Sequence, residues 1–129
     1  SWADNIDYQR VLPIVAEVGG RIVGEATLHF GKRSTRHVGE VRIYLEPAIR
    51  GRGLGTIMLK ELIALARQAE LHYLLAQVVL EQTEVIKAFQ NLGFKVEATI
   101  RDYFMTEDGK THNVVILLLP LLAETRYEF

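Results

Sequence analysis

The sequence predicts a single α/β (α+β) domain whose elements follow the order β-β-β-α-β-α-β-β. Its 129 residues, 49% of them hydrophobic and 24% charged, suffice for one hydrophobic core but not for two. Runs that alternate apolar and polar residues precede one long amphipathic helix. The sequence contains no internal repeat or linker, so residues 1–129 are expected to form one domain with tails at residues 1–10 and 121–129.

Three strands open the predicted domain. Residues 12–18 and 22–30 form β-prone runs, and Gly19-Gly20 between them tolerates the positive φ angles of a tight hairpin turn. Residues 31–37 are polar and basic without periodicity, which predicts an exposed connection. Residues 38–46 alternate apolar and polar side chains with a period of two, which predicts the third strand.

A long helix and a further strand follow. Residues 54–69 place Leu54, Met58, Leu62 and Leu65 on one stripe, as expected for a helix that packs on a sheet. Residues 73–80 are almost wholly apolar, which predicts a central strand buried on both faces.

A short helix and a second hairpin complete the order. Residues 83–92 form the helix, and Gly93 closes it because glycine readily adopts the left-handed conformation that ends helices. Residues 94–105 and 112–119 are two strands, and the segment at residues 107–110 turns between them.

Composition and charge exclude several classes of function. Fifteen basic and sixteen acidic residues give a formal net charge of −1, so no general positive field attracts nucleic acid. The absence of cysteine excludes disulfides, a thiolate nucleophile and cysteine-ligated metal, and agrees with a cytoplasmic location. The longest apolar run, residues 114–123, is shorter than the roughly 20 residues of a membrane span. No metal site is expected, because metal-ligand spacing is absent among His29, His37, His72 and His112.

The glycine-rich segment Arg50-Gly51-Arg52-Gly53-Leu54-Gly55 joins the third strand to the long helix. Glycines leave backbone N–H groups accessible, and the first helical turn adds unpaired N–H groups and the positive end of the helix dipole. The segment therefore predicts an anion cradle suited to pyrophosphate, with a tight connection lacking any ligand as the alternative. A dinucleotide fingerprint is disfavoured because Thr56 occupies the place of its third glycine.

Two short motifs are distinctive: Arg50-x-x-Gly53-x-Gly55 after a strand, and Phe89-Gln90-Asn91-Leu92-Gly93-Phe94, where a short helix ends before Gly-Phe. The first resembles the acyl-CoA signature of the GNAT N-acetyltransferase family, and the second is similar to that family's second motif. The resemblance implies a mixed, centrally splayed sheet, acetyl-CoA as donor, and pantetheine lying beside the backbone of Leu45. The cofactor-binding residues that it implies are Leu45, Arg50, Gly51, Arg52, Gly53, Leu54, Gly55, Thr56, Gln82 and Phe89.

Acetyl transfer to an amine requires a proton acceptor, because a lysine-type ammonium has a pKa of about 10.4. Glu40 is the first choice for this base, and Glu46 and Glu81 remain alternatives. Many family members use a tyrosine as the acid, but the chain has Phe89 at that position, so Tyr103 is the substitute candidate. Gln82 likewise replaces the family's frequent asparagine.

The predicted function is transfer of an acetyl group from acetyl-CoA directly to a primary amine, without a covalent enzyme intermediate. The alternatives are a non-catalytic acyl-CoA-binding regulatory module and a purely structural domain. A protein lysine, a protein N-terminus and a small amine all remain open as acceptors. Family members normally begin with a strand and one or two helices, and only about ten residues precede the first hairpin here, so we expect these elements to be missing. The alternatives that follow are a fragment of a longer protein, an unusually open acceptor site, and a site completed by a homodimer or a missing partner domain.

Overall fold

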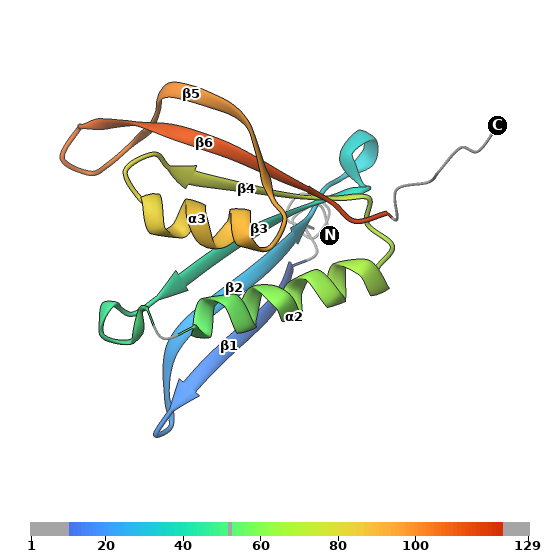
Figure 1. Cartoon of the computed structure of the whole chain (residues 1–129), viewed down its shortest axis with the longest axis horizontal. Coiled ribbons are helices and arrows are strands. Elements are labelled where there is room, and N and C mark those ends of the chain that lie inside the picture. The colour runs from blue at the N-terminus through green and yellow to red at the C-terminus, as the bar shows by residue number, and fades with distance from the viewer. Residues whose placement is uncertain (1–10, 52, 123–129) are drawn as a thin grey trace, which may run out of the picture.

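The computed structural model describes residues 11–51 and 53–122, which form one six-stranded sheet and two α-helices (Figure 1). The sheet has the strand order β1-β2-β3-β4-β6-β5. Its strands are β1 (Val11–Val18), β2 (Arg21–Phe30), β3 (Val38–Leu45), β4 (Tyr73–Val79), β5 (Lys95–Met105) and β6 (Thr111–Pro120). The α-helices are α2 (Leu54–Gln68) and α3 (Thr83–Asn91), and short 3-10 turns lie at η1 (Arg33–Thr35) and η2 (Pro47–Ile49).

The predicted elements and their order are confirmed. Strands β1, β2 and β3 pair antiparallel, β3 pairs parallel with β4, and β4, β6 and β5 pair antiparallel. The sheet is mixed because helix α2 connects β3 to β4. A connection of this length returns the chain to the same end of the sheet, so that β4 runs parallel to β3. The segment predicted as an irregular connection at residues 31–37 contains the turn η1.

Both described helices pack on the same face of the sheet (Figure 1). The prediction that residues 73–80 are buried on both faces is wrong. Leu74, Ala76 and Val78 are buried toward the helices, whereas Tyr73 and Gln77 are exposed on the other face. Since no described helix covers that second face, the apolar character of β4 exceeds what its burial requires.

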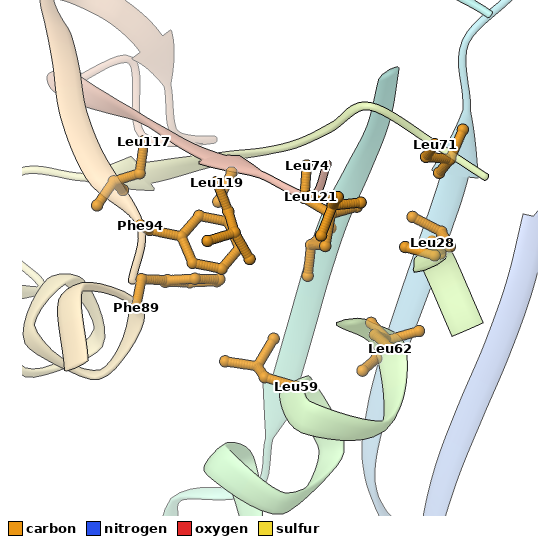
Figure 2. Close-up of a cluster of buried hydrophobic side chains, with 14 of the residues drawn as sticks. Leu28, Leu59, Leu62, Leu71, Leu74, Phe89, Phe94, Leu117, Leu119 and Leu121 are labelled. Carbon is orange, nitrogen blue, oxygen red and sulfur yellow. The ribbon is translucent and has the colours of Figure 1, made fainter. Parts of the chain in front are cut away.

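The core lies between the helices and the sheet (Figure 2). Leu62 of α2 is fully buried against the first half of the sheet. Phe89 of α3 is 2% exposed and packs edge-to-face on Phe94, with ring centroids 4.9 Å apart. These aromatic rings meet leucines of β6 in Figure 2, so they anchor α3 to the carboxy-terminal half of the sheet.

Truncation of Phe89 to alanine should destabilise the fold. Removing a fully buried phenylalanine leaves a cavity, which costs about 3–5 kcal/mol of unfolding free energy. Urea unfolding of Phe89→Ala measures this loss. Phe104→Ala is the matched control, because the Phe104 side chain is 50% exposed and its truncation should change stability by only about 0.5 kcal/mol. Equal losses in the two variants would contradict the assignment of Phe89 to the core.

The carboxy-terminal tail starts later than residue 121. Leu121 is buried, its N–H donates to the His72 carbonyl at 2.8 Å, and its carbonyl accepts from the Arg67 guanidinium at 2.6 Å. The end of β6 is thereby fixed to α2. The other predicted tail residues, 1–10 and 123–129, lie outside the described residues.

The sheet splays at its centre, as the resemblance implies. Pairing of β3 with β4 extends from Val38↔Tyr73 to Val41↔Ala76 and then stops. Strand β3 continues to Leu45 and β4 to Val79, each still paired on its outer side with β2 or β6. Figure 1 shows the two strand ends diverging. A gap between their facing edges therefore opens at the carboxyl ends of β3 and β4.

Candidate active site

The facing edge of β3 turns backbone polar groups into this gap. The N–H of Glu46 donates to the carbonyl of Val23 on β2 at 2.9 Å. Hydrogen-bonding direction alternates along an antiparallel strand, so the backbone groups of Leu45 and Ile43 point away from β2. Beyond Val41 no described strand pairs with this edge. It can therefore accept an extended ligand that pairs as an added strand does.

Strand β4 lines the opposite side of the gap in the same way. The N–H of Leu80 donates to the carbonyl of Asn113 on β6 at 2.9 Å, so by alternation the backbone groups of Gln77 and Val79 face β3. The Val79 carbonyl accepts from the N–H of Gln82 at 2.9 Å. The Gln77 carbonyl and the Val79 N–H are thus the polar groups that β4 offers to a ligand.

The glycine turn lies at the end of β3 and leads into α2. Gly51 and Gly53 have φ angles of 79° and 80°, which non-glycine residues rarely adopt. Gly53 is the N-cap of α2, without a side-chain cap, and its carbonyl accepts the first helical bond from Ile57. The first-turn N–H groups, those of Leu54, Gly55 and Thr56, have no acceptor within the helix, so together with the helix dipole they can bind an anion.

Gly55, unlike Gly51 and Gly53, has no positive φ angle, and its role is to leave room for the side chain of Leu45. A β-carbon at this position would lie 3.2 Å from Cδ1 of Leu45. The absence of a side chain at position 55 therefore lets the first turn of α2 lie against the end of β3 without displacing Leu45. This contact holds the anion site beside the gap.

Arg50 connects the glycine turn to β3. Its Nε donates to the carbonyl of Leu45 at 2.9 Å, and its guanidinium lies 6.0 Å from the ring centroid of Tyr44. The Leu45 carbonyl is therefore engaged by Arg50, which leaves the Leu45 N–H and both backbone groups of Ile43 for a ligand. The sequence-based prediction named Leu45 but missed Ile43, which the strand register alone reveals. Arg52 lies outside the described residues.

A pocket of about 270 Å³ opens on the helix-free face of the sheet, at the point where β3 and β4 part. Glu40 faces it from β3 beside Leu75 of β4, one pair before the last parallel pair. Arg42 Nη2 lies 3.2 Å from Glu40 Oε1. The pocket is lined by His29, Phe30, Gly31, Thr35, Val38, Glu40, Arg42, Leu75 and Gln77.

His29, which was considered from the sequence only as a metal ligand, lines this pocket. It lies opposite Glu40 in the β2–β3 register, and its Nε2 is 2.8 Å from the Thr27 hydroxyl. Burial, and then the positive charge of Arg42, lower the pKa of His29 below 6.5, while Glu40 partly opposes them. The environment therefore favours the neutral form of the imidazole. Only the pairing of residues 29 and 40 between the second and third strands could have indicated this from the sequence.

The lowered pKa of His29 makes folding stability depend on pH. The unfolded chain takes up this proton near pH 6.5, whereas the folded chain resists it until a lower pH. The stabilising contribution is therefore present above pH 6.5 and is lost as the pH falls below it. Urea unfolding at pH 7.5 and pH 5.5 should show a smaller acid-induced loss in His29→Gln than in the unaltered protein. An identical loss in both would contradict the assignment.

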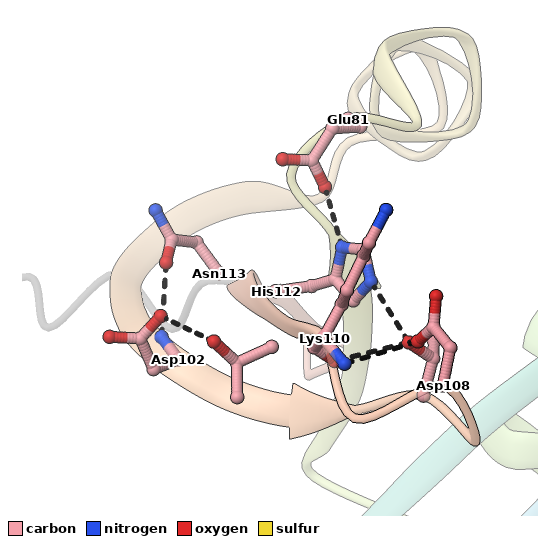
Figure 3. Close-up of polar contacts among 8 residues, drawn as sticks. Glu81, Asp102, Asp108, Lys110, His112 and Asn113 are labelled. Atoms are coloured by element: carbon pink, nitrogen blue, oxygen red, sulfur yellow. Dashed lines mark hydrogen bonds and ion pairs between the residues drawn. The ribbon is translucent and has the colours of Figure 1, made fainter.

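The alternative carboxylates are engaged elsewhere. Glu46 accepts two hydrogen bonds from Arg21, at 2.8 and 2.7 Å. Glu81 Oε1 lies 3.5 Å from Nδ1 of His112, near the turn of the β5–β6 hairpin (Figure 3). Neither lines the pocket that contains Glu40.

Three predicted site residues lie apart from this pocket. Tyr103 is 56% exposed on β5, in a stretch between Ile100 and Phe104 where pairing with β6 is irregular. Gln82 is the N-cap of α3 and makes no side-chain cap bond. Phe89 lies in the core, so its side chain offers almost no surface to a ligand. The roles suggested for these residues stay predictions.

Within the described residues, no group of histidine or acidic side chains could hold a metal ion. None of the helices in this part of the chain is both long and apolar enough to cross a membrane.

Comparison with known proteins identifies the class. The sequence model of the Acetyltransferase (GNAT) family matches residues 1–94, and the chain belongs to this family. It is 25% identical over 118 residues to YwnH of Bacillus subtilis (strain 168), which is provisionally named a phosphinothricin acetyltransferase, and covers 72% of that protein. It is 33% identical over 89 residues to the L-methionine sulfoximine/L-methionine sulfone acetyltransferase of Salmonella typhimurium. These matches cover 90% and 66% of the chain, and the second spans 51% of its relative.

Solved structures share the fold. The ribosomal-protein-alanine N-acetyltransferase from Brucella melitensis superposes with a TM-score of 0.78 at 28% identity, over 93% of this chain and 74% of that one. The protein yncA from Salmonella typhimurium, crystallised with its cofactor acetyl-CoA, has a TM-score of 0.78 at 26% identity. That match covers 97% of this chain and 72% of yncA. The fold and the acetyl-CoA donor expected from the two sequence motifs are thus confirmed at the level of the family.

Proposed function

We propose that the protein is an N-acetyltransferase that moves the acetyl group of acetyl-CoA directly to a primary amine. The main support for this proposal is that the glycine turn lies next to the gap between β3 and β4. The two meet at Leu45, whose carbonyl accepts a hydrogen bond from Arg50. CoA contains a diphosphate, which fits the first turn of α2, and an extended pantetheine arm with amide groups, which fits the gap. The name of the Brucella melitensis relative, an N-acetyltransferase, supports an amine as acceptor.

The donor is held largely by the backbone. The N–H groups of Leu54, Gly55 and Thr56 bind the diphosphate, and Arg50 adds positive charge beside them. The pantetheine amides pair with Ile43 and the Leu45 N–H on one side and with Gln77 and Val79 on the other. The thioester then lies where β3 and β4 part, beside the pocket that contains Glu40.

The acceptor reaches the thioester from that pocket. Its neutral nitrogen attacks the acetyl carbon, a C–N bond forms, the C–S bond breaks and CoA leaves as a thiolate. The proton lost by the amine passes to the Glu40 carboxylate, directly or through one water molecule. His29 is a second proton acceptor on the neighbouring strand.

A calorimetric titration with acetyl-CoA, with desulfo-CoA and free CoA as controls, tests donor binding. Release of CoA in the presence of amines, with detection of the acetylated amine by mass spectrometry, tests transfer. We expect micromolar binding and amine-dependent CoA release. Binding without transfer to any amine would indicate the alternative function, a non-catalytic acyl-CoA-binding module. Absence of binding would contradict both functions.

A further inference from the structure

The helix-free pocket presents two opposite charges side by side. Glu40 and Arg42 are alternate residues of β3, so their side chains leave the same face of the sheet. Their closest atoms, Glu40 Oε1 and Arg42 Nη2, lie 3.2 Å apart. A carboxylate and a guanidinium at this separation are complementary to a ligand that carries an ammonium and an anion at neighbouring positions.

The two charges lie at different depths. The Glu40 side chain is 26% exposed and that of Arg42 is 61% exposed, so the carboxylate lies deeper and the guanidinium stands at the mouth. A zwitterion that matches both charges must therefore enter with its amine inward. This orientation places the nitrogen beside Glu40, one residue before the pairing of β3 with β4 ends, and the carboxylate beside Arg42, one residue after it.

The size of the pocket favours a small acceptor. Its volume of about 270 Å³ lies just below the roughly 300–1,000 Å³ of pockets that hold drug-sized ligands. Its apolar lining comes from Phe30, Val38 and Leu75, and its polar lining beyond the charged pair comes from His29, Thr35 and Gln77. An apolar side chain of moderate length therefore fits beside the two charged groups.

We propose that this pocket binds a free α-amino acid, with Arg42 binding its carboxylate and Glu40 its ammonium. The proposal rests on the proposed N-acetyltransferase function and specifies the acceptor. A lysine side chain within a protein carries no anion next to its amine, and neither does a protein N-terminus. Those acceptors would leave Arg42 without a partner in the ligand, and a polyamine would bring positive charge against it.

Matched acceptors test the proposal with the full chain and acetyl-CoA. L-leucine is compared with 3-methylbutylamine, which lacks only the carboxylate, and with L-leucinamide, in which that carboxylate is a neutral amide. L-methionine and 3-(methylthio)propylamine form a second pair. We expect kcat/KM for each acid to exceed that of its carboxylate-free partner by at least about tenfold, the value of a hydrogen-bonded charge. Leucinamide is a stringent control. Its α-amine lies next to an amide and has a pKa of only about 7.7–8.0, so more of it is already unprotonated and able to attack the thioester.

The arginine variants identify the group responsible. Arg42→Gln should reduce the acid-to-amine ratio of kcat/KM to near one, mainly by raising KM for the acids. Arg36→Gln removes the same charge from an arginine that bonds the Arg33 carbonyl and does not line the pocket, so it should keep the ratio.

Each outcome has a distinct meaning. Equal or faster acetylation of the carboxylate-free amines, or a ratio that Arg42→Gln leaves unchanged, would overturn the amino-acid assignment while the N-acetyltransferase function stands. If acetyl-CoA binds but no amine of either series is acetylated, the amino-acid assignment fails, and the proposed function fails with it only if peptide amines and polyamines are not acetylated either.

Discussion

Gly53→Glu is expected to abolish acetyl-CoA binding, with a loss of affinity of roughly 100-fold or more. Gly53 is the N-cap of α2, and a glutamate there brings a negative charge to N–H groups that otherwise face the diphosphate. Repulsion of the diphosphate adds to the loss of a charge-assisted contact, and together these exceed about 3 kcal/mol. Calorimetric titration with acetyl-CoA measures the effect.

Two control variants separate charge from backbone strain. Gly20 in the β1–β2 turn has a φ angle of 79°, almost that of Gly53, and a β-carbon at either position meets no atom within 4 Å. Gly20→Glu therefore imposes the same strain away from the site and should keep acetyl-CoA binding. Gly53→Asn adds a side chain that tolerates positive φ without adding charge. Retained affinity in Gly53→Glu would contradict the assignment of the diphosphate to this turn.

Glu40→Gln is expected to lower kcat by roughly 10²–10⁴-fold, the usual contribution of a positioned general base. Glutamine preserves the shape of the side chain and can still bond Arg42, but it cannot accept the proton of the amine. Donor binding should be unaffected, because Glu40 lies in the acceptor pocket and not on the glycine turn. Steady-state CoA release with a saturating acceptor measures kcat, and titration measures donor affinity.

The pH dependence of this variant gives a second readout. As the pH rises toward the pKa of the acceptor amine, more of the amine arrives without its proton, so the deficit of Glu40→Gln should shrink. Glu25→Gln is the control, since Glu25 is an exposed carboxylate on β2 outside the pocket. If Glu40→Gln retains full kcat, while Glu81→Gln loses it, the base lies on the His112 side of the gap and the present assignment is wrong.

Much of the fold can be predicted from local patterns. The alternation in β3, the stripe of α2 and the Gly-Phe that follows α3 are periodic or short-range signals, and each predicted element is present within a few residues of its expected bounds. The glycine turn was predicted for the same reason. The positive φ angles of Gly51 and Gly53 are features of the local backbone, so they do not depend on contacts with residues far away in the chain.

The candidate site was less predictable, because its residues meet across strands. Glu40 was selected by its strand, and its period of two also places Arg42 on the same face, but the neighbour His29 became visible only through the β2–β3 register. The engagement of the Leu45 carbonyl by Arg50 likewise depends on how the turn folds back on β3. The burial of Phe89 in the core likewise depends on its contact with Phe94 after the helix ends, and its suggested role at the cofactor stays a prediction.

The sequence alone therefore determined the class of fold, the order of its elements and the turn that can hold a diphosphate, because these depend on periodicity and on backbone conformation. The tertiary structure decided where β3 leaves β4, which backbone groups face the gap, and which charged side chains share the pocket beside it. These features depend on pairing between segments far apart in the chain. A single residue of register changes the face on which every side chain of a strand lies, and no local pattern specifies it fully.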